Sequence, residues 1–256
     1  GGTLNQTWTP GAPPPFGTAI AIGVTGPGSG AGTLNISSGG VFDTGTANAL
    51  AVGISVSAIG ASAGNGTINI NDGTMLLGAG SAPPSPGAQG LAVGVDAGAS
   101  GKVNVGDAAG AAGSATLDLA TNNAAAVLGA TLSSGSGGTG TMSIFSDGIL
   151  NQGTGTVTVG DDGGVGTLNI DGGTYNSTTG LLAVADGGTG TLNLKGGALS
   201  TGGAVSVGIA AGGNGNFNVS GGTGTISGET NVGRNASGNG ALTQTGGTLN
   251  VGYLAI

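Results

Sequence analysis

The chain has 256 residues, of which 63 are glycine, and it carries a net charge of −8 with only three basic residues. Nucleic-acid binding is excluded, because phosphate contacts require clustered lysine and arginine. There is no cysteine and no histidine, which excludes disulfides and the commonest proton shuttle. The hydrophobic share of 37% is too high for a disordered chain, yet aromatic residues reach only 3%, so we expect a core one layer of small aliphatic side chains thick.

A five-residue unit recurs along the whole chain, and this repeat is the strongest signal in the sequence. The unit GTLNI, with small changes, occupies Gly32–Ile36, Gly66–Ile70, Gly101–Val105, Gly140–Ile144, Gly166–Ile170, Gly190–Leu194, Gly215–Val219 and Gly240–Gln244. Its copies start 34 to 39 residues apart before Gly140 and 24 to 26 residues apart after it. A period in this range is typical of solenoid proteins.

Each copy contains three short segments joined by glycine-rich corners. The second segment follows the unit after one corner, as in Gly173–Asn176, and the third follows after another corner, as in Ala204–Gly208. All three segments alternate apolar and polar residues, which predicts strands with one buried face. The corners are predicted to turn sharply at glycine, often at positive φ.

The alternation assigns the inward side chains of every strand. On the first strand they include Leu34, Ile36, Leu168, Ile170, Leu192 and Leu194. On the second strand the predicted column is Leu4, Phe42, Met75, Leu117, Leu150, Tyr175, Leu199, Ile226 and Leu249. On the third strand they include Ile20, Ile22, Val157, Val159, Val205 and Val207.

These features predict an all-β fold, a right-handed parallel β-helix (β-solenoid) of about nine coils with three short strands each. The first coil lacks its first strand. Residues 1–256 are expected to form a single solenoid segment. Loops are expected to leave it near residues 6–17, 78–90 and 106–114, the first two of which carry proline.

Two longer stretches carry a family resemblance. Residues 188–214 read GTGTLNLKGGALSTGGAVSVGIAAGGN and residues 238–256 read GNGALTQTGGTLNVGYLAI. They resemble the glycine-rich repeat of PEP-CTERM-associated and autotransporter passenger-type surface proteins. The resemblance covers nearly the whole chain and is clearest from Gly140 to Ile256. It implies a secreted β-solenoid, often one part of a very large surface polypeptide, without catalytic residues.

Outward positions of the first strand form a regular grid of hydroxyl and amide side chains. Its members are Thr33, Asn35, Thr67, Asn69, Thr167, Asn169, Thr191 and Asn193. Since threonine favours strands, the grid either simply solvates a flat sheet or forms a face that orders water or binds ice or glycan.

Outward positions of the third strand carry small side chains, such as Ala51, Ala92 and Ala183. This surface is expected to be smooth. It either permits lateral contact with a partner sheet or is a plain exposed face.

Acidic residues gather at the corners after the third strand. Asp161 and Asp186 are expected on successive coils, close to Asp162, where their carboxylate oxygens are candidate Ca²⁺ ligands. The alternative is solvated surface charge, because the calcium-binding nonapeptide of β-rolls is absent. No other cofactor is expected. Asp171 is expected to form a surface ion pair with Lys195 on the next coil.

The sequence predicts no enzyme, because a nucleophile–base pair is hard to assemble without histidine or cysteine. We expect a structural protein, secreted to the extracellular space or the bacterial cell surface, that gives reach, stiffness and adhesion as part of a large surface protein or fibre. The alternative is a binding module, an adhesin or a glycan- or ice-binding face built on the Thr/Asn grid.

The expected partners are further copies of the chain, associating end to end or laterally, and extracellular polysaccharide or another surface. Neither end shows a cap, which indicates a piece of a longer protein or copies stacked end to end. No membrane insertion is expected, because no apolar run approaches the about 20 residues of a membrane helix.

Overall fold

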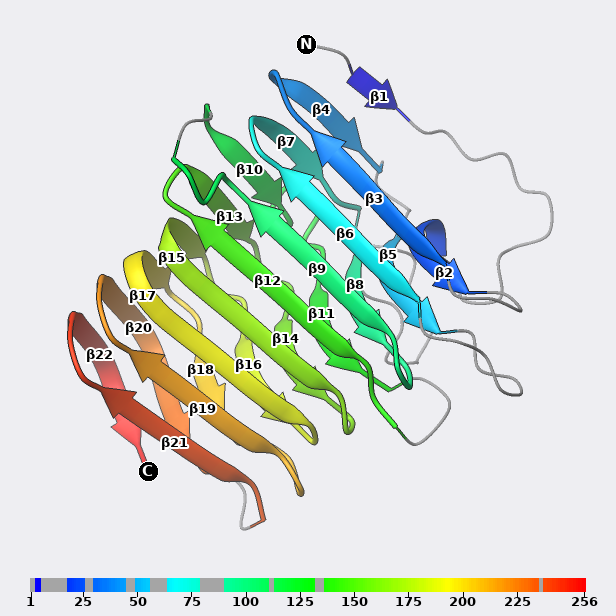
Figure 1. Ribbon diagram of the computed structural model, residues 1–256. Coiled ribbons are helices and arrows are strands. Elements are labelled where there is room, and N and C mark those ends of the chain that lie inside the picture. Colours follow the sequence, from blue (N-terminus) through cyan, green and yellow to red (C-terminus); the bar gives the residue numbers. More distant parts are fainter. Residues whose placement is uncertain are drawn as a thin grey trace.

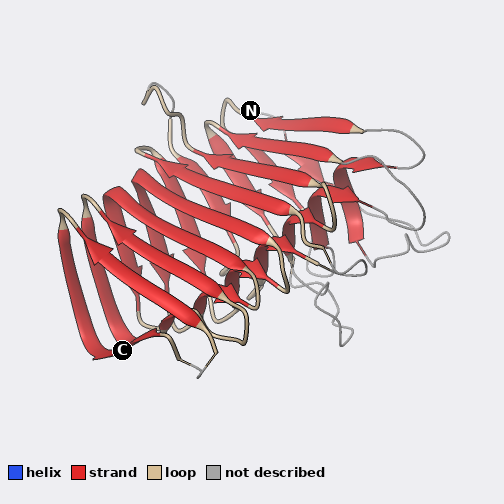
Figure 2. Cartoon of the chain, turned by 60° about the horizontal axis from the view of Figure 1, so that its bottom comes forward, coloured by secondary structure: helices blue, strands red, loops and turns tan. Residues whose placement is uncertain are grey.

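The computed structural model describes residues 3–5, 18–25, 30–44, 49–55, 64–78, 90–110, 113–131, 136–234 and 237–256. In these residues the chain forms 22 strands and no helix, so none of them crosses a membrane as a helix. Every strand pair among them is parallel. The strands wind into one long coil, which confirms the predicted parallel β-helix (Figure 1, Figure 2).

The strands form three faces, to which each successive coil contributes. The first face contains β3 (Ala31–Ile36), β6 (Asn65–Ile70), β9 (Ser100–Val105), β12 (Thr139–Phe145), β19 (Asn214–Val219), β21 (Asn239–Gln244) and the first halves of β15 (Val165–Ser177) and β17 (Thr189–Thr201). The second face contains β1 (Thr3–Asn5), β4 (Gly40–Asp43), β7 (Gly73–Leu76), β10 (Ala115–Asp118), β13 (Gly148–Gln152), the second halves of β15 and β17, and the first halves of β20 (Thr223–Val232) and β22 (Thr248–Ala255). The third face contains β2 (Thr18–Thr25), β5 (Ala49–Ser55), β8 (Leu91–Val95), β11 (Ala126–Ala130), β14 (Val157–Asp161), β16 (Leu182–Asp186), β18 (Val205–Val207) and the second halves of β20 and β22.

The winding is right-handed. In Figure 1 the near strands run toward the upper left and the chain returns behind them, while the coils advance from the N-terminus at the top to the C-terminus at the lower left. Each strand pairs with the strand of the same face in the next coil, about 4.8 Å further along the axis. The described strands make up nine coils, the first of which is represented by β1 and β2.

A single layer of aliphatic side chains fills the coils. Leu168, Ile170, Leu192 and Leu194 are fully buried, and the register sets the first pair directly against the second. These side chains belong to one continuous core cluster that extends along the solenoid. The prediction that these side chains of the first strand point inward is confirmed. The side chains of Leu4 and Ile20, which were also predicted to point inward, are not among the side chains that the structure describes.

On the second face Ile226 is buried, as predicted, but its predicted place in the column is wrong. Ile226 was expected beside Leu199, whereas the register pairs Leu199 with Gly224 and places Ile226 beside Thr201. Glycine leaves a space in this column, and the Leu249 side chain of the next coil fills it. A Cβ atom added to Gly224 would lie 2.6 Å from Leu249 Cδ1. The aliphatic column therefore continues through Leu249 leaning into the gap.

The corner after the third strand brings two backbones into close approach. Gly208 has φ +69°, and a Cβ atom there would lie 2.3 Å from the carbonyl oxygen of Asn239, the first residue of β21. The equivalent residue one coil earlier is Ala185, which is fully buried at φ 65°. The corner after Ala185 is the shorter of the two. Gly190 lies five positions after Ala185, whereas Gly215 lies seven positions after Gly208. The prediction of corners at positive φ is confirmed.

A polar pair interrupts the apolar interior between the second and third faces. The Tyr175 hydroxyl donates to Gln152 Oε1, and both residues are buried. Gln152 Nε2 in turn donates to the Leu181 carbonyl at 3.0 Å. Burial raises the pKa of Tyr175 far above its ordinary value. The pair satisfies its own polar groups inside the coil, as buried polar groups require.

The expected loops fall largely outside the described residues. This holds for the whole of 6–17 and for 79–89. Within the third loop, the described residues 106–110 form a turn in which Gly110 N–H donates to the Asp107 carbonyl at 2.9 Å.

Candidate functional site

The outward side chains of the first face, here called the asparagine face, form two columns along the solenoid axis. One column contains Asn35, Asn69, Asn104, Ser143, Asn169, Asn193, Asn218 and Thr243. The other contains Thr33, Thr67, Lys102, Thr141, Thr167, Thr191, Asn216 and Ala241. The register thus brings together all eight residues of the predicted grid.

The asparagine column is a hydrogen-bonded ladder. Asn69 Nδ2 donates to Asn35 Oδ1 at 2.8 Å, and Asn104 Nδ2 donates to Asn69 Oδ1 at 2.7 Å. The ladder continues with Asn193 donating to Asn169 at 2.9 Å and Asn218 donating to Asn193 at 3.0 Å. Each net contribution is on the order of 1 kcal/mol. The same bonds fix the amides in a flat row, so the row is preorganised.

The ladder breaks at Ser143. Asn169 Nδ2 reaches the Ser143 hydroxyl at 3.4 Å, a long bond, and Asn104 Oδ1 is buried without a hydrogen-bond partner. Serine is shorter than asparagine and presents no amide to continue the row. The asparagine face therefore consists of two ladder segments, on either side of β12.

Sequence reasoning included only part of this ladder among the candidate residues. It left out Asn104 and Asn218, although both occupy the fourth position of the repeat unit, in GKVNV and GNFNV. That shared position is the signal that identifies them. The second face carries a related bond, from Asn176 Nδ2 to Asn151 Oδ1 at 3.3 Å.

The small residues of the third face are less accessible than the sequence suggested. Ala92 is 6% exposed and Ala183 is 1% exposed, so the expectation of a smooth exposed surface is wrong at these two positions. The side chain of Ala51 lies outside the described ones. Ser206, beside Ala183 in the register, is also fully buried.

The acidic corner residues are close together, as expected. Asp161 pairs in register with Asp186, and Asp162 N–H donates to the Asp186 carbonyl at 3.0 Å. Burial, then the charges of Asp162 and Asp186, raise the pKa of Asp161 to about 6. Burial and then Asp162 raise the pKa of Asp186. Among the described residues there is no group of three or more acidic side chains placed to hold a metal ion, so this geometry gives the calcium prediction no support.

The predicted ion pair is present on the surface. Lys195 Nζ lies 4.0 Å from Asp171 Oδ2, and both side chains are about half exposed. An exposed pair of this length contributes less than about 1 kcal/mol.

The two columns of the asparagine face present regularly spaced hydrogen-bond donors and acceptors, and Lys102 is their one charged side chain. Searches against protein-family models, curated proteins and solved structures found no match to the chain. Any function must therefore be argued from the described geometry and from the repeat itself.

Proposed function

We propose that the chain is a structural element, a stiff rod that works outside the cell or at a bacterial cell surface as part of a large surface protein or fibre. The observation that carries this proposal is the continuity of the first face, which is paired without a gap from β3 to β21. Each inner coil is held by two neighbours, and such nearest-neighbour contacts are what stabilise a solenoid.

The repeat supports the location and the passive role. Its resemblance to PEP-CTERM-associated and autotransporter passenger-type proteins favours secretion and a place in a long surface polypeptide. The lack of histidine and cysteine favours a role without catalysis. Copies would associate end to end or laterally, and the rod would offer its faces to extracellular polysaccharide or another surface.

Electron microscopy of the purified chain tests the rod. We expect straight particles of roughly 40 Å per nine coils, or fibres built from them, at a spacing of about 4.8 Å per coil. Flexible strings or round particles would refute the structural role. Fractionation of cells that make the protein tests the location, and recovery in the cytosol alone would refute the surface assignment.

A second candidate function is a binding module that uses the asparagine face for ice or an extended glycan. The observation in its favour is the ladder, because side chains that are already ordered lose less entropy on binding. Thermal hysteresis and cosedimentation with insoluble polysaccharides measure such binding. Thr191→Lys, on the asparagine face, should abolish it, whereas Ser200→Lys, on the second face of the same strand, should not. Equal effects of both changes would exclude this face as the binding surface.

A further inference from the structure

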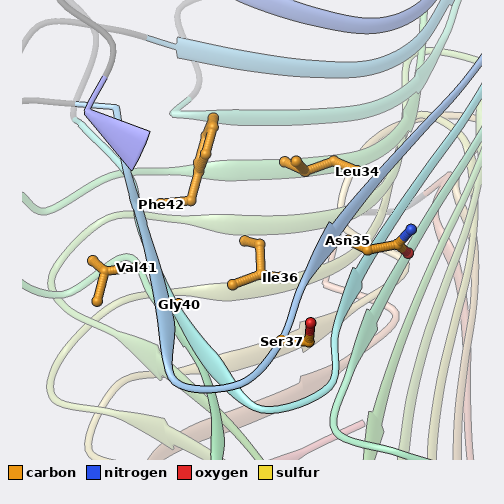
Figure 3. Close-up of a pocket in the computed structure, with 7 residues that line it drawn as sticks. All are labelled: Leu34, Asn35, Ile36, Ser37, Gly40, Val41 and Phe42. Atoms are coloured by element: carbon orange, nitrogen blue, oxygen red, sulfur yellow. The ribbon is translucent and has the colours of Figure 1, made fainter. Parts of the chain in front are cut away.

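The asparagine face carries no acidic residue, although the chain has a net charge of −8. None of the eleven acidic residues occupies either of its columns. Figure 1 shows the strands of this face side by side on one side of the solenoid. In Figure 3 Asn35 points away from the interior of the coil, whereas Leu34 and Ile36 point into it. Two copies can therefore bring these faces together without setting carboxylates against each other.

An edge row of strand-initial residues widens the face beside the threonine column. Thr139, Val165 and Thr189 belong to this row and pair in register. Val165 is 43% exposed, an apolar side chain on a mostly polar surface. With the edge row the face is five residues wide, and its eight described strands cover roughly 650 Å². Two such faces together bury about 1,300 Å², within the roughly 1,200–2,000 Å² of specific, stable interfaces.

The ladder asparagines keep hydrogen-bonding groups for a partner. A side-chain amide has two N–H donors and an oxygen with two acceptor sites. Asn193 donates one N–H to Asn169 and accepts one bond from Asn218. Within the described residues these bonds leave Asn193 one N–H and one acceptor site. A row of such amides is complementary to a second row of the same kind, as in tightly packed sheet interfaces that contain asparagine ladders.

The symmetry of a pair determines which columns meet. Two identical copies are related by a two-fold axis. If this axis runs along the strands, the solenoid axes are antiparallel and the asparagine columns lie opposite each other. If it runs along the solenoid, the copies are parallel and each asparagine column lies opposite the edge row of the other copy, which includes Val165. Because valine offers an amide no hydrogen bond, the antiparallel arrangement satisfies more polar groups.

We propose that the asparagine face is a homodimer interface in which two copies pair antiparallel, sheet on sheet at a distance of about 10 Å. The proposal rests on the lateral association included in the proposed function, and it adds the face and the orientation. The area, the lack of acidic residues and the self-complementary amides are the arguments for a second copy as the occupant. Charged residues are depleted in interface cores, so Lys102 weakens the pairing.

Sedimentation equilibrium of the purified chain measures the pairing. Thr167→Lys should weaken it at least tenfold, because a further ammonium group is buried in the interface. Thr174→Lys, on the second face of the same strand β15, should change it less than threefold. Lys102 already occupies the threonine column two coils earlier, so the fold accommodates lysine there. Lys102→Thr should strengthen the pairing at least threefold, and this result stands even if Thr167→Lys fails to fold.

Spin labels measure the orientation. Because the chain has no cysteine, single labels can be placed at Asn71→Cys, Ser146→Cys and Ser220→Cys, exposed residues that directly follow β6, β12 and β19. In a parallel pair the distance between the two labels is the same at all three positions. In an antiparallel pair with the described strands overlapped, the labels are offset along the axis by about 5 Å at Ser146 and about 24 Å at the other two positions. Pulsed electron paramagnetic resonance should therefore give the shortest distance for Ser146→Cys.

The outcomes separate this interface from the rod itself. A chain that stays monomeric up to about 1 mM, the range of weak binding, would overturn the proposal, whereas straight particles in the electron microscope would still support the rod. Equal effects of Thr167→Lys and Thr174→Lys would place the contact elsewhere and overturn it too. Equal label distances at the three positions would overturn the antiparallel orientation. A monomeric chain that cosediments with insoluble polysaccharide, and loses this binding in Thr167→Lys, would assign the face to a glycan instead.

Discussion

The close approach at Gly208 makes a sharp prediction, because Gly212 in the same corner supplies a control. Both glycines lie at positive φ, +69° and +82°. A Cβ atom at Gly208 would lie 2.3 Å from the Asn239 carbonyl oxygen, whereas a Cβ atom at Gly212 would meet nothing within 4 Å. Replacing each with alanine separates the cost of the backbone conformation from the cost of the contact.

The two costs differ in size. Alanine at positive φ is strained by about 1–2 kcal/mol, partly offset by about 0.4–1 kcal/mol from a less flexible unfolded chain. Gly212→Ala should therefore reduce the free energy of unfolding by at most about 1.5 kcal/mol. Gly208→Ala adds a steric overlap with backbone, for which about 1–3 kcal/mol is typical. Relieving the overlap also disturbs the bond from Gly233 N–H to the Val207 carbonyl, 2.8 Å long and worth about 1 kcal/mol.

Urea denaturation followed by circular dichroism measures both variants against the parent chain. We expect Gly208→Ala to lose about 2–4 kcal/mol more than Gly212→Ala, the sum of the overlap and the disturbed bond. In thermal melts this difference corresponds to roughly 5–15 °C for a chain of this size. Equal losses in the two variants would refute the reasoning, because conformation alone would then explain the glycine. The alanine at position 185 is compatible with the prediction, since its corner is shorter.

Three further changes test the interior and the ladders. Asp161→Asn should stabilise the chain above pH 6 by roughly 1 kcal/mol after solvent screening. The raised pKa of Asp161 means that folding favours its protonated carboxyl, so the parent gains stability as pH falls from about 6 toward 4. In pH-dependent melts the variant should gain less over this range, because it keeps the contribution of Asp186 but loses that of Asp161; an equal gain in both proteins would contradict this reasoning. Asn193→Asp should cost about 1–2 kcal/mol at pH 7, because a carboxylate replaces the amide donor of the ladder, and less below pH 4, where it can donate again. Tyr175→Phe should lower the urea midpoint by an amount equivalent to about 1–3 kcal/mol, because Gln152 Oε1 is left buried without its donor; an unchanged midpoint would mean that water replaces the hydroxyl.

Much of the fold follows from the sequence, because a period of two in the repeat unit determines which side of a strand each residue faces. Leu168 and Leu192 are buried for this reason. The error at Ile226 arose because the column was completed with the nearest hydrophobic residue and the glycine corners of the two coils were not aligned. When Gly221–Gly222 is matched with Gly196–Gly197, Gly224 and not Ile226 falls beside Leu199.

The candidate surfaces were harder to predict. Alternation indicates that Ala183 points out of the coil, yet it carries no information on whether that side is covered, and Ala183 is 1% exposed. The polar pair of Gln152 and Tyr175 depends on contacts between residues of different coils, which no single segment encodes. The ladder positions were visible in the sequence, but which amide donates to which was not.

The direction of the amide bonds has an electrical consequence. In a parallel sheet, backbone donors point both ways along the coil axis, so their dipoles largely cancel. The side-chain bonds behave differently, since at Asn69, Asn104, Asn193, Asn218 and Asn239 the donor always lies one coil after its acceptor. Their dipoles add, leaving one tip of the molecule slightly positive and the other slightly negative. Neighbouring molecules in a bundle would then repel weakly when aligned and attract weakly when one is reversed.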